Sequence, residues 1–154
     1  PEQQGWGAAR MGRRGERETA ADRQTVWAAL TSAEVLKEGV AGAQEVSGSH
    51  DEGFEATVVQ KVGPVKATFR GIVTLPEQAP PERLKLVGEG KGGAAGFAKG
   101  SADVTLTETE NGTLLAYEVD AKVGGKLAQL GSRIVDGFAK KMADQFFARL
   151  EEHF

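Results

Sequence analysis

The fold is decided by residues 54–75, FEATVVQKVGPVKATFRGIVTL, in which apolar and polar side chains alternate on both sides of Gly63-Pro64. Successive side chains of an extended strand point to opposite faces, so one face of each segment is mostly apolar while the other carries Glu, Thr, Lys and Arg. The Gly-Pro pair between the two segments indicates a turn. The stretch therefore predicts a β-hairpin with one solvated face.

The same alternation extends from Ala43 to Val123, interrupted by short clusters of Gly, Pro, Asn and Asp that indicate turns. The later strands continue the inward apolar face at Leu84, Leu86, Ala102, Val104, Leu106, Leu115, Tyr117, Val119 and Val123. Asn111-Gly112 is a strong hairpin signal, since a type I′ turn requires a positive φ at both central residues. These patterns predict a meander of antiparallel hairpins.

The N-terminal part is expected to begin with a flexible tail, residues 1–14, which is Gly-rich and lacks a hydrophobic period. A single domain should then cover residues 15–154, with a first strand over residues 17–21. Asp22 and Ser32 are suited to cap two short helices in series, because their side-chain oxygens accept hydrogen bonds from free backbone N–H groups. In the first of these helices Val26, Trp27 and Leu30 share one face.

After Gly124-Gly125 the hydrophobic period becomes that of a helix, and one long helix is predicted to run nearly to Phe154. Its apolar stripe comprises Leu127, Leu130, Ile134, Phe138, Met142, Gln145, Phe146 and Leu150. Gly131 and Gly137 each cost about 1 kcal/mol relative to Ala, so tertiary packing must hold this helix. An antiparallel sheet with one dry face needs a cover, which predicts an α+β fold whose curved sheet grips the long helix.

Composition narrows the class of protein. The chain is 40% hydrophobic and 27% charged with a net charge of −3, which fits a globular domain and gives no bulk attraction to nucleic acid. It contains no cysteine, which excludes disulfides, thiolate metal sites and a cysteine nucleophile. No apolar run approaches the roughly 20 residues of a membrane-spanning helix, and we expect a cytoplasmic protein.

The segment Gly88-Glu89-Gly90-Lys91-Gly92-Gly93 matches the pattern G-x-G-x-x-G of dinucleotide-binding proteins. That fingerprint requires a helix N-terminus for the pyrophosphate and a parallel βαβ unit, and neither follows here. We interpret Gly88 to Gly100 as a flexible loop between antiparallel strands.

Residues that could carry catalysis are scarce. The two histidines, His50 and His153, lie in a turn and near the C-terminus, with no carboxylate cluster beside them, and are expected at the surface. No metal-ligand spacing or nucleophile elbow is evident, so we expect no metal, no cofactor and no enzymatic activity. Basic residues of the last helix could contact a membrane or an acidic partner, although a solvated helix face explains them as well.

The order of elements resembles the helix-grip fold of the START/Bet v 1-like (SRPBCC) superfamily. Within it the chain resembles the CoxG family of carbon monoxide dehydrogenase subunits in residues 21–30 (ADRQTVWAAL), 61–67 (KVGPVKA), 88–102 and 124–131 (GGKLAQLG). The resemblance implies an accessory protein of molybdenum-containing hydroxylases, with recruitment to the inner face of the membrane and a cavity for lipophilic molecules such as quinones. One motif differs from the family pattern. Family members often carry a Cys-Ile-Pro-Gly-Cys-like segment after the second helix, whereas this chain has Gly39 to Ala43 there, without cysteine or proline.

Our leading hypothesis is non-catalytic binding of a hydrophobic small molecule, a quinone or other lipid, between the sheet and the long helix. The candidate ligand-binding residues are Phe54, Val58, Gln60, Phe69, Val73, Leu86, Val104, Tyr117, Leu130, Ile134, Phe138 and Met142. The Tyr117 hydroxyl or the Gln60 amide would bond a ligand oxygen. The alternative is a protein-interaction or membrane-recruitment module whose interior is packed, because a filled core and a cavity share one binary pattern.

Overall fold

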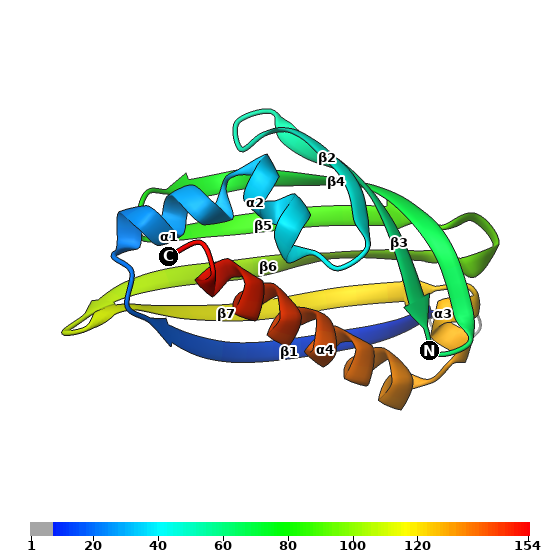
Figure 1. The fold of residues 1–154 in the computed structure, drawn as a ribbon. Coiled ribbons are helices and arrows are strands. Elements are labelled where there is room, and N and C mark those ends of the chain that lie inside the picture. Colours follow the sequence, from blue (N-terminus) through cyan, green and yellow to red (C-terminus); the bar gives the residue numbers. More distant parts are fainter. Residues whose placement is uncertain (1–7) are drawn as a thin grey trace.

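The computed structural model describes residues 8–154 and shows one antiparallel sheet that bends around a C-terminal helix (Figure 1). Seven strands lie in the order β1-β7-β6-β5-β4-β3-β2. Their bounds are β1 Ala8–Thr19, β2 Ala43–Ser49, β3 Gly53–Val62, β4 Val65–Ala79, β5 Arg83–Lys91, β6 Phe97–Thr109 and β7 Gly112–Gly124. The helix-grip α+β architecture and the meander predicted from the period-two pattern are thus confirmed.

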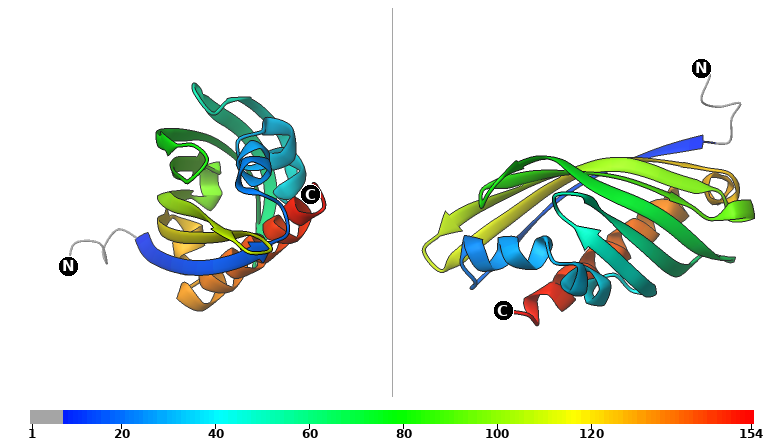
Figure 2. Two further views of the ribbon diagram at one scale, coloured as in Figure 1. Left: turned by 90° about the vertical axis from the view of Figure 1, so that its left-hand side faces the viewer. Right: turned by 90° about the horizontal axis from the view of Figure 1, so that it is seen from above.

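Two short helices and the C-terminal helix cover the concave face of the sheet (Figure 2). They are α1 Arg23–Leu30, α2 Ala33–Gly39 and α4 Ser132–Glu151, and a single turn, α3 Lys126–Gln129, precedes α4. The predicted caps are present. The Asp22 carboxylate accepts a hydrogen bond from the Thr25 N–H at 2.8 Å, and the Ser32 hydroxyl accepts one from the Val35 N–H at 3.3 Å.

The long helix predicted after Gly124-Gly125 is in fact two helices. α3 ends at Gln129, and Gly131 has a φ of +91°, a backbone conformation that favours glycine because it lacks a Cβ. The chain changes direction there before α4 begins at Ser132. The apolar stripe that was predicted along one continuous helix therefore does not continue on the same face after the break.

The predicted boundaries of the N-terminus are also corrected. β1 begins at Ala8 and ends at Thr19, and it pairs with β7 from Ala8 opposite Gly124 to Thr19 opposite Thr113. Residues 8–14, assigned to the flexible tail, are therefore part of an edge strand, and residues 1–7 lie outside the described residues. The strand predicted over residues 17–21 thus starts earlier and ends two residues sooner, and its first part was missed because the inward positions include Arg13, Gly15 and Arg17, which lack an apolar period.

The hairpin at Asn111-Gly112 is present, but its turn is displaced by one residue. Thr109 pairs with Gly112, so Glu110 and Asn111 occupy the two-residue loop. No residue other than glycine has a positive φ in the described part of the chain, so this turn is not of type I′.

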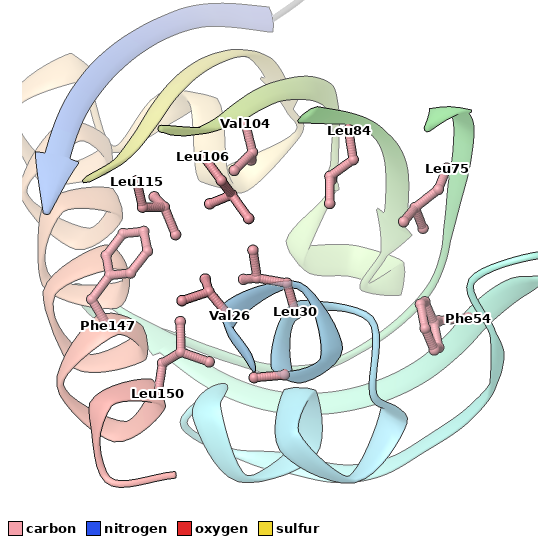
Figure 3. Close-up of a cluster of buried hydrophobic side chains, with 11 residues drawn as sticks. Val26, Leu30, Phe54, Leu75, Leu84, Val104, Leu106, Leu115, Phe147 and Leu150 are labelled. Atoms are coloured by element: carbon pink, nitrogen blue, oxygen red, sulfur yellow. The ribbon is translucent and has the colours of Figure 1, made fainter. Parts of the chain in front are cut away.

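The hydrophobic core is divided into two clusters. The larger one, here named the α1 core, lies under α1, α2 and the end of α4 and includes Val26, Leu30, Phe54, Leu75, Leu84, Val104, Leu106, Leu115, Phe147 and Leu150 (Figure 3). Trp27 packs against it, as expected for a core residue. The smaller one, the α3 core, comprises Val62, Val123, Leu127 and Val135. Between the two, inward side chains of the central strands are only half-buried.

Thr113 connects β7 to the segment before α1. It is fully buried, and its hydroxyl donates a hydrogen bond of 2.8 Å to the Ala21 carbonyl. We predict that Thr113→Val lowers the free energy of unfolding by about 1–2 kcal/mol, because the carbonyl loses its partner in a site of nearly unchanged shape. Urea denaturation measures this, with the exposed Thr107→Val as control. Equal midpoints for the two variants would contradict the assignment.

Candidate functional site

An apolar chamber lies between the two cores, on the concave face of the sheet. Its main compartment, about 410 Å³, is lined chiefly by Ala56, Val58, Phe69, Gly71, Val73, Leu86, Gly88, Gly90, Ala98, Gly100, Ala102, Val119 and Ala121. A second compartment of about 210 Å³, here named the helix-side compartment, lies toward α4 and adds Gln60, Val62, Val123, Leu127, Val135, Phe138 and Met142. Val58, Phe69, Gly90 and Ala98 border both, so the two compartments adjoin.

The chamber is hollow because small residues are in register across neighbouring strands. Gly71 of β4 pairs with Gly90 of β5, and Gly88 of β5 pairs with Gly100 of β6. At these inward positions a larger side chain would fill the space that the chamber occupies. The glycines also permit close backbone approach, since a Cβ on Gly71 would lie only 2.6 Å from the Glu89 carbonyl oxygen.

The glycine-rich segment is therefore not the flexible loop that the sequence suggested. Residues 88–91 belong to β5 and residues 97–100 to β6, and only residues 92–96 form the connection, with one 3-10 turn at Gly93–Ala95. β5 and β6 are antiparallel and no long helix follows, so the G-x-G-x-x-G match does not form a dinucleotide site.

Seven of the twelve predicted site residues line the chamber. They are Val58, Gln60, Phe69, Val73, Leu86, Phe138 and Met142. The other five lie outside it. Phe54 and Val104 are buried in the α1 core, Tyr117 packs against that core, and Leu130 packs against the α3 core. Ile134 is 40% exposed, because the break at Gly131 rotates it off the inward stripe and places Val135 there instead.

Sequence reasoning missed the floor of the chamber, which consists of Gly and Ala at inward positions. A detectable signal was present, since residues 88–102 alternate Gly88, Gly90, Ala98, Gly100 and Ala102 inward against charged or polar neighbours. In a strand with one dry face, consecutive small residues at inward positions indicate space or a close backbone contact.

Polar groups are few inside the chamber. Gln60 is the one polar side chain among those that line the helix-side compartment. Its amide nitrogen donates a hydrogen bond to the Ala41 carbonyl, which joins β3 to the segment Gly39 to Ala43. The Gly42 carbonyl accepts a further hydrogen bond from Val59 N–H at 2.9 Å. The surface of the helix-side compartment is nevertheless apolar throughout, so Gln60 borders it through its aliphatic part.

The titratable side chains noted in the sequence lie away from the chamber. His50 contacts the Gln78 amide oxygen at 3.1 Å, and His153 lies 3.0 Å from the Glu38 carboxylate. Within residues 8–154 as described, no group of three or more His, Cys, Asp or Glu side chains could hold a metal ion.

A second hollow lies on the opposite, convex face of the sheet. It is about 480 Å³ and is bordered by Ile72 and Val87 but also by Glu89, Lys99, Asp120 and Lys122. No helix of residues 8–154 covers this face, and Ile72 is 55% exposed. Charged side chains border this hollow, whereas the helix-side compartment of the chamber has an apolar surface and is bordered by α4.

Polar contacts attach the C-terminal part of α4 to its neighbours on both sides. On one side Arg17 of β1 bonds Asp144 at 2.7 Å and lies 5.5 Å from the ring centroid of Phe147, which stacks on Tyr117. On the other side Arg149 donates to the Glu38 carbonyl of α2 at 3.3 Å. These contacts attach the C-terminal part of α4 to β1 on one side and to α2 on the other.

The bonds to Asp144 make this fastening sensitive to pH. The hydrogen bond from Lys140 is the largest cause of a lowered pKa of Asp144; desolvation opposes it, and the charges of Lys140 and Arg17 and the hydrogen bond from Arg17 lower the pKa further. A carboxylate whose folded-state pKa is lowered contributes stability above its unfolded pKa of about 3.9, and this contribution is lost as the pH falls through the folded value.

We therefore predict that Asp144→Asn lowers the urea midpoint near pH 7 and has a much smaller effect near pH 2.5. The matched control is Glu151→Gln, at an exposed position on the same helix. An equal loss for Asp144→Asn at both pH values would show that the carboxylate charge does not fasten α4.

A curved antiparallel sheet closed by a C-terminal helix around an apolar chamber defines the class of helix-grip proteins with the START/Bet v 1-like fold. The chain belongs to the CoxG family of carbon monoxide dehydrogenase subunits, whose family model matches residues 15–154. This family is one of accessory subunits and indicates no catalytic class.

Solved structures share the fold. A conserved protein from Geobacillus kaustophilus is 26% identical with a TM-score of 0.85, and the match covers 92% of this chain and 93% of that one. A protein from Rhizobium leguminosarum is 16% identical with a TM-score of 0.70 and 95% coverage of both chains. A search of curated proteins found no match. Among the described residues, no helix has the length and apolar character needed to cross a membrane.

Proposed function

We propose that this protein is a non-catalytic carrier that holds a hydrophobic small molecule, a quinone or other lipid, in the chamber under α4. The observation that carries the proposal is a hollow of about 410 Å³ on the concave face of the sheet, lined mainly by Gly, Ala, Val, Leu and Phe, which adjoins the apolar compartment of about 210 Å³ beneath α4. Ligand pockets in proteins have volumes of this order and a predominantly apolar lining.

The energetics of such a site favour an apolar cargo. Burial of apolar surface contributes about 25 cal/mol per Å², so a ligand that buries on the order of 300 Å² gains about 7 kcal/mol before the costs of association. Lining side chains such as Val58, Phe69 and Met142 are half-buried although they point inward, which indicates that solvent reaches the chamber. A ligand that displaces this water needs few polar contacts.

Gln60 supplies the polar contact of the proposed site. One of its amide N–H groups is held by the Ala41 carbonyl, and the second N–H would donate to a carbonyl oxygen of the ligand once the side chain turns toward the compartment, whose surface is apolar in the unliganded structure. The cysteine-free segment Gly39 to Ala43 thereby acquires a role, since it positions the one polar side chain of the helix-side compartment. Tyr117 stacks with Phe147 at 5.2 Å and is the less suited of the two predicted donors.

The partner proposed for the carrier is a molybdenum hydroxylase of the carbon monoxide dehydrogenase type. This part of the proposal is supported by the family, whose name denotes a subunit of that enzyme. We propose a cytoplasmic, accessory role without catalysis. The alternative of an interaction module with a packed interior is disfavoured by the unfilled chamber between the α1 core and the α3 core.

The first test is native mass spectrometry of the purified protein, with organic extraction and chromatography of anything that co-purifies. An additional mass that matches an isoprenoid quinone or another lipid is expected. A bare protein that also fails to take up added decylubiquinone, a soluble quinone, would overturn the carrier proposal in favour of an interaction module.

Two tryptophan variants on one helix test the location of the site. Met142 lines the helix-side compartment, so Met142→Trp should fill it and weaken decylubiquinone binding by at least about tenfold. Ile134 lies outside the chamber and is 40% exposed, so Ile134→Trp should leave the affinity in solution unchanged within about twofold. Calorimetric titration without vesicles measures both. Wild-type affinity for Met142→Trp would place the ligand elsewhere.

A further inference from the structure

One arginine of β1 has no partner within the described part of the chain. Arg13 makes no ion pair with another residue of that part, and its Nε atom is buried without a hydrogen-bond partner. A buried donor in this state costs free energy, because it has lost its bond to water and gained none from the protein. Such a group in a folded protein therefore requires a separate explanation.

The other arginines of the same strand show that partners are available there. Arg14, the next residue, donates from its Nε atom to the Glu118 carboxylate at 2.9 Å. Arg17 bonds Asp144 of α4 at 2.7 Å. Arg13 is half-buried, as Arg17 is, yet it alone of these three is left without an anion.

The side chain of Arg13 belongs to the concave face of the sheet. Successive side chains of a strand alternate between faces, so Arg13 shares its face with Gly15 and Arg17. Arg17 reaches α4 through Asp144, and a Cβ on Gly15 would lie 2.6 Å from the ring of Tyr117, which packs against the α1 core. Arg13 therefore lies on the side of β1 that faces the interior.

The register of the sheet places Arg13 at the border of the chamber. Arg13 pairs with Val119 of β7, and both Val119 and Ala121 line the main compartment. Directly opposed side chains on neighbouring antiparallel strands have Cβ atoms about 4.5–5.5 Å apart. Because β1 is an edge strand next to α4 (Figure 1), its guanidinium marks the limit of the chamber on this side.

The charges around Arg13 favour an anion that comes from the chamber. On the convex side, a hollow of about 580 Å³ beside Arg13 is bordered by three carboxylates, those of Asp103, Glu118 and Asp120. These groups repel an anion. Among the described residues, no acid lines the helix-side compartment, and the one acid that borders the main compartment, Glu89, is accompanied by Lys99.

A guanidinium beside an apolar chamber selects the end group of a ligand. Its planar N–H donors match the two oxygens of a carboxylate, and it stays protonated at every pH at which the protein is folded. The pair is stronger in a poorly solvated site than in water. One cation balances the single charge of a carboxylate, whereas a phosphate dianion would keep an uncompensated charge.

We propose that Arg13 binds the carboxylate of an acidic amphiphile whose apolar chain occupies the chamber. This inference rests on the proposed carrier function and adds a preference among its possible cargos. Chain molecules with a carboxylate end, of which a fatty acid is the simplest, should bind more tightly than uncharged molecules of the same length. The carboxylate supplies the acceptor that Arg13 Nε lacks, and Val119 and Ala121 contact the chain beside it.

Decanoate and decan-1-ol test the preference, because they have the same chain length and differ in the end group. Calorimetric titration of the wild-type protein at pH 8, where the acid is ionised, should give an affinity for decanoate at least about tenfold higher than that for decan-1-ol. Equal affinities would overturn the inference. This comparison uses the unmodified protein, so it does not depend on the folding of any variant.

Variants at two adjacent positions of β1 locate the carboxylate. Arg13→Gln should remove the preference for decanoate and change the affinity for decan-1-ol by less than about twofold. The matched control is Arg14→Gln, which removes the same charge on the opposite face of the strand and should keep the preference. Circular dichroism melting checks that both variants are folded. An equal loss of preference in both would show that net charge, and not a bond to Arg13, attracts decanoate.

Decylubiquinone separates this inference from the carrier function. Wild-type protein that binds decylubiquinone and decan-1-ol but shows no preference for decanoate would refute the role of Arg13 and leave the carrier function in place. Failure to bind any of the three molecules would overturn the carrier function and, with it, this inference. A preference for decanoate that Arg13→Gln abolishes and Arg14→Gln retains supports both.

Discussion

The shape of this protein depends on the small side chains that face each other across β4, β5 and β6. Gly71 pairs with Gly90, and Gly88 pairs with Gly100, at positions where the sheet turns its concave face toward α4. A Cβ on Gly71 would lie 2.6 Å from a backbone oxygen of the neighbouring strand, so the close approach requires glycine. The same absence of side chains leaves the interior hollow. Curvature and cavity therefore have one cause.

A hollow interior must be compensated by dense packing elsewhere, because unfilled space forfeits van der Waals contacts. The α1 core supplies this at one end, where Leu115 and Leu150 are both 2% exposed. The α3 core supplies it at the other end with Val62 and Val123. α4 crosses from one core to the other, and Arg17 and Arg149 attach it to the elements on either side. The chamber thus lies between two densely packed hydrophobic cores.

The sequence predicted most of the fold because most of its strands and helices carry a clear hydrophobic period. The prediction failed where the backbone conformation, and not the spacing of apolar residues, determines the structure. The positive φ of Gly131 divides the C-terminal helix and moves Ile134 outward, and no count of apolar spacing can detect such a break. Most of β1 before Arg17 was missed because its inward side chains include Arg13 and Arg17, and Arg17 forms an ion pair with Asp144 of α4.

The candidate site was predictable only in part, because the hydrophobic period identifies large inward residues and not the space beside them. Large inward residues such as Phe69, Leu86 and Phe138 were found by their period, yet a period alone does not distinguish filled from empty space. The informative residues were the inward glycines and alanine of residues 88–100, which were interpreted as a loop. Small residues at consecutive inward positions would have located the chamber.

The most direct test of the account is methyl NMR of the protein labelled at Ile, Leu, Val and Met during titration with decylubiquinone. Methyl resonances of Val58, Val73, Leu86 and Met142 should shift or broaden, because these side chains line the chamber. Those of Leu115 and Leu150 in the α1 core should stay unchanged. Shifts confined to the convex face, at Ile72 and Val87, or no shifts at saturating quinone, would contradict a ligand-binding chamber.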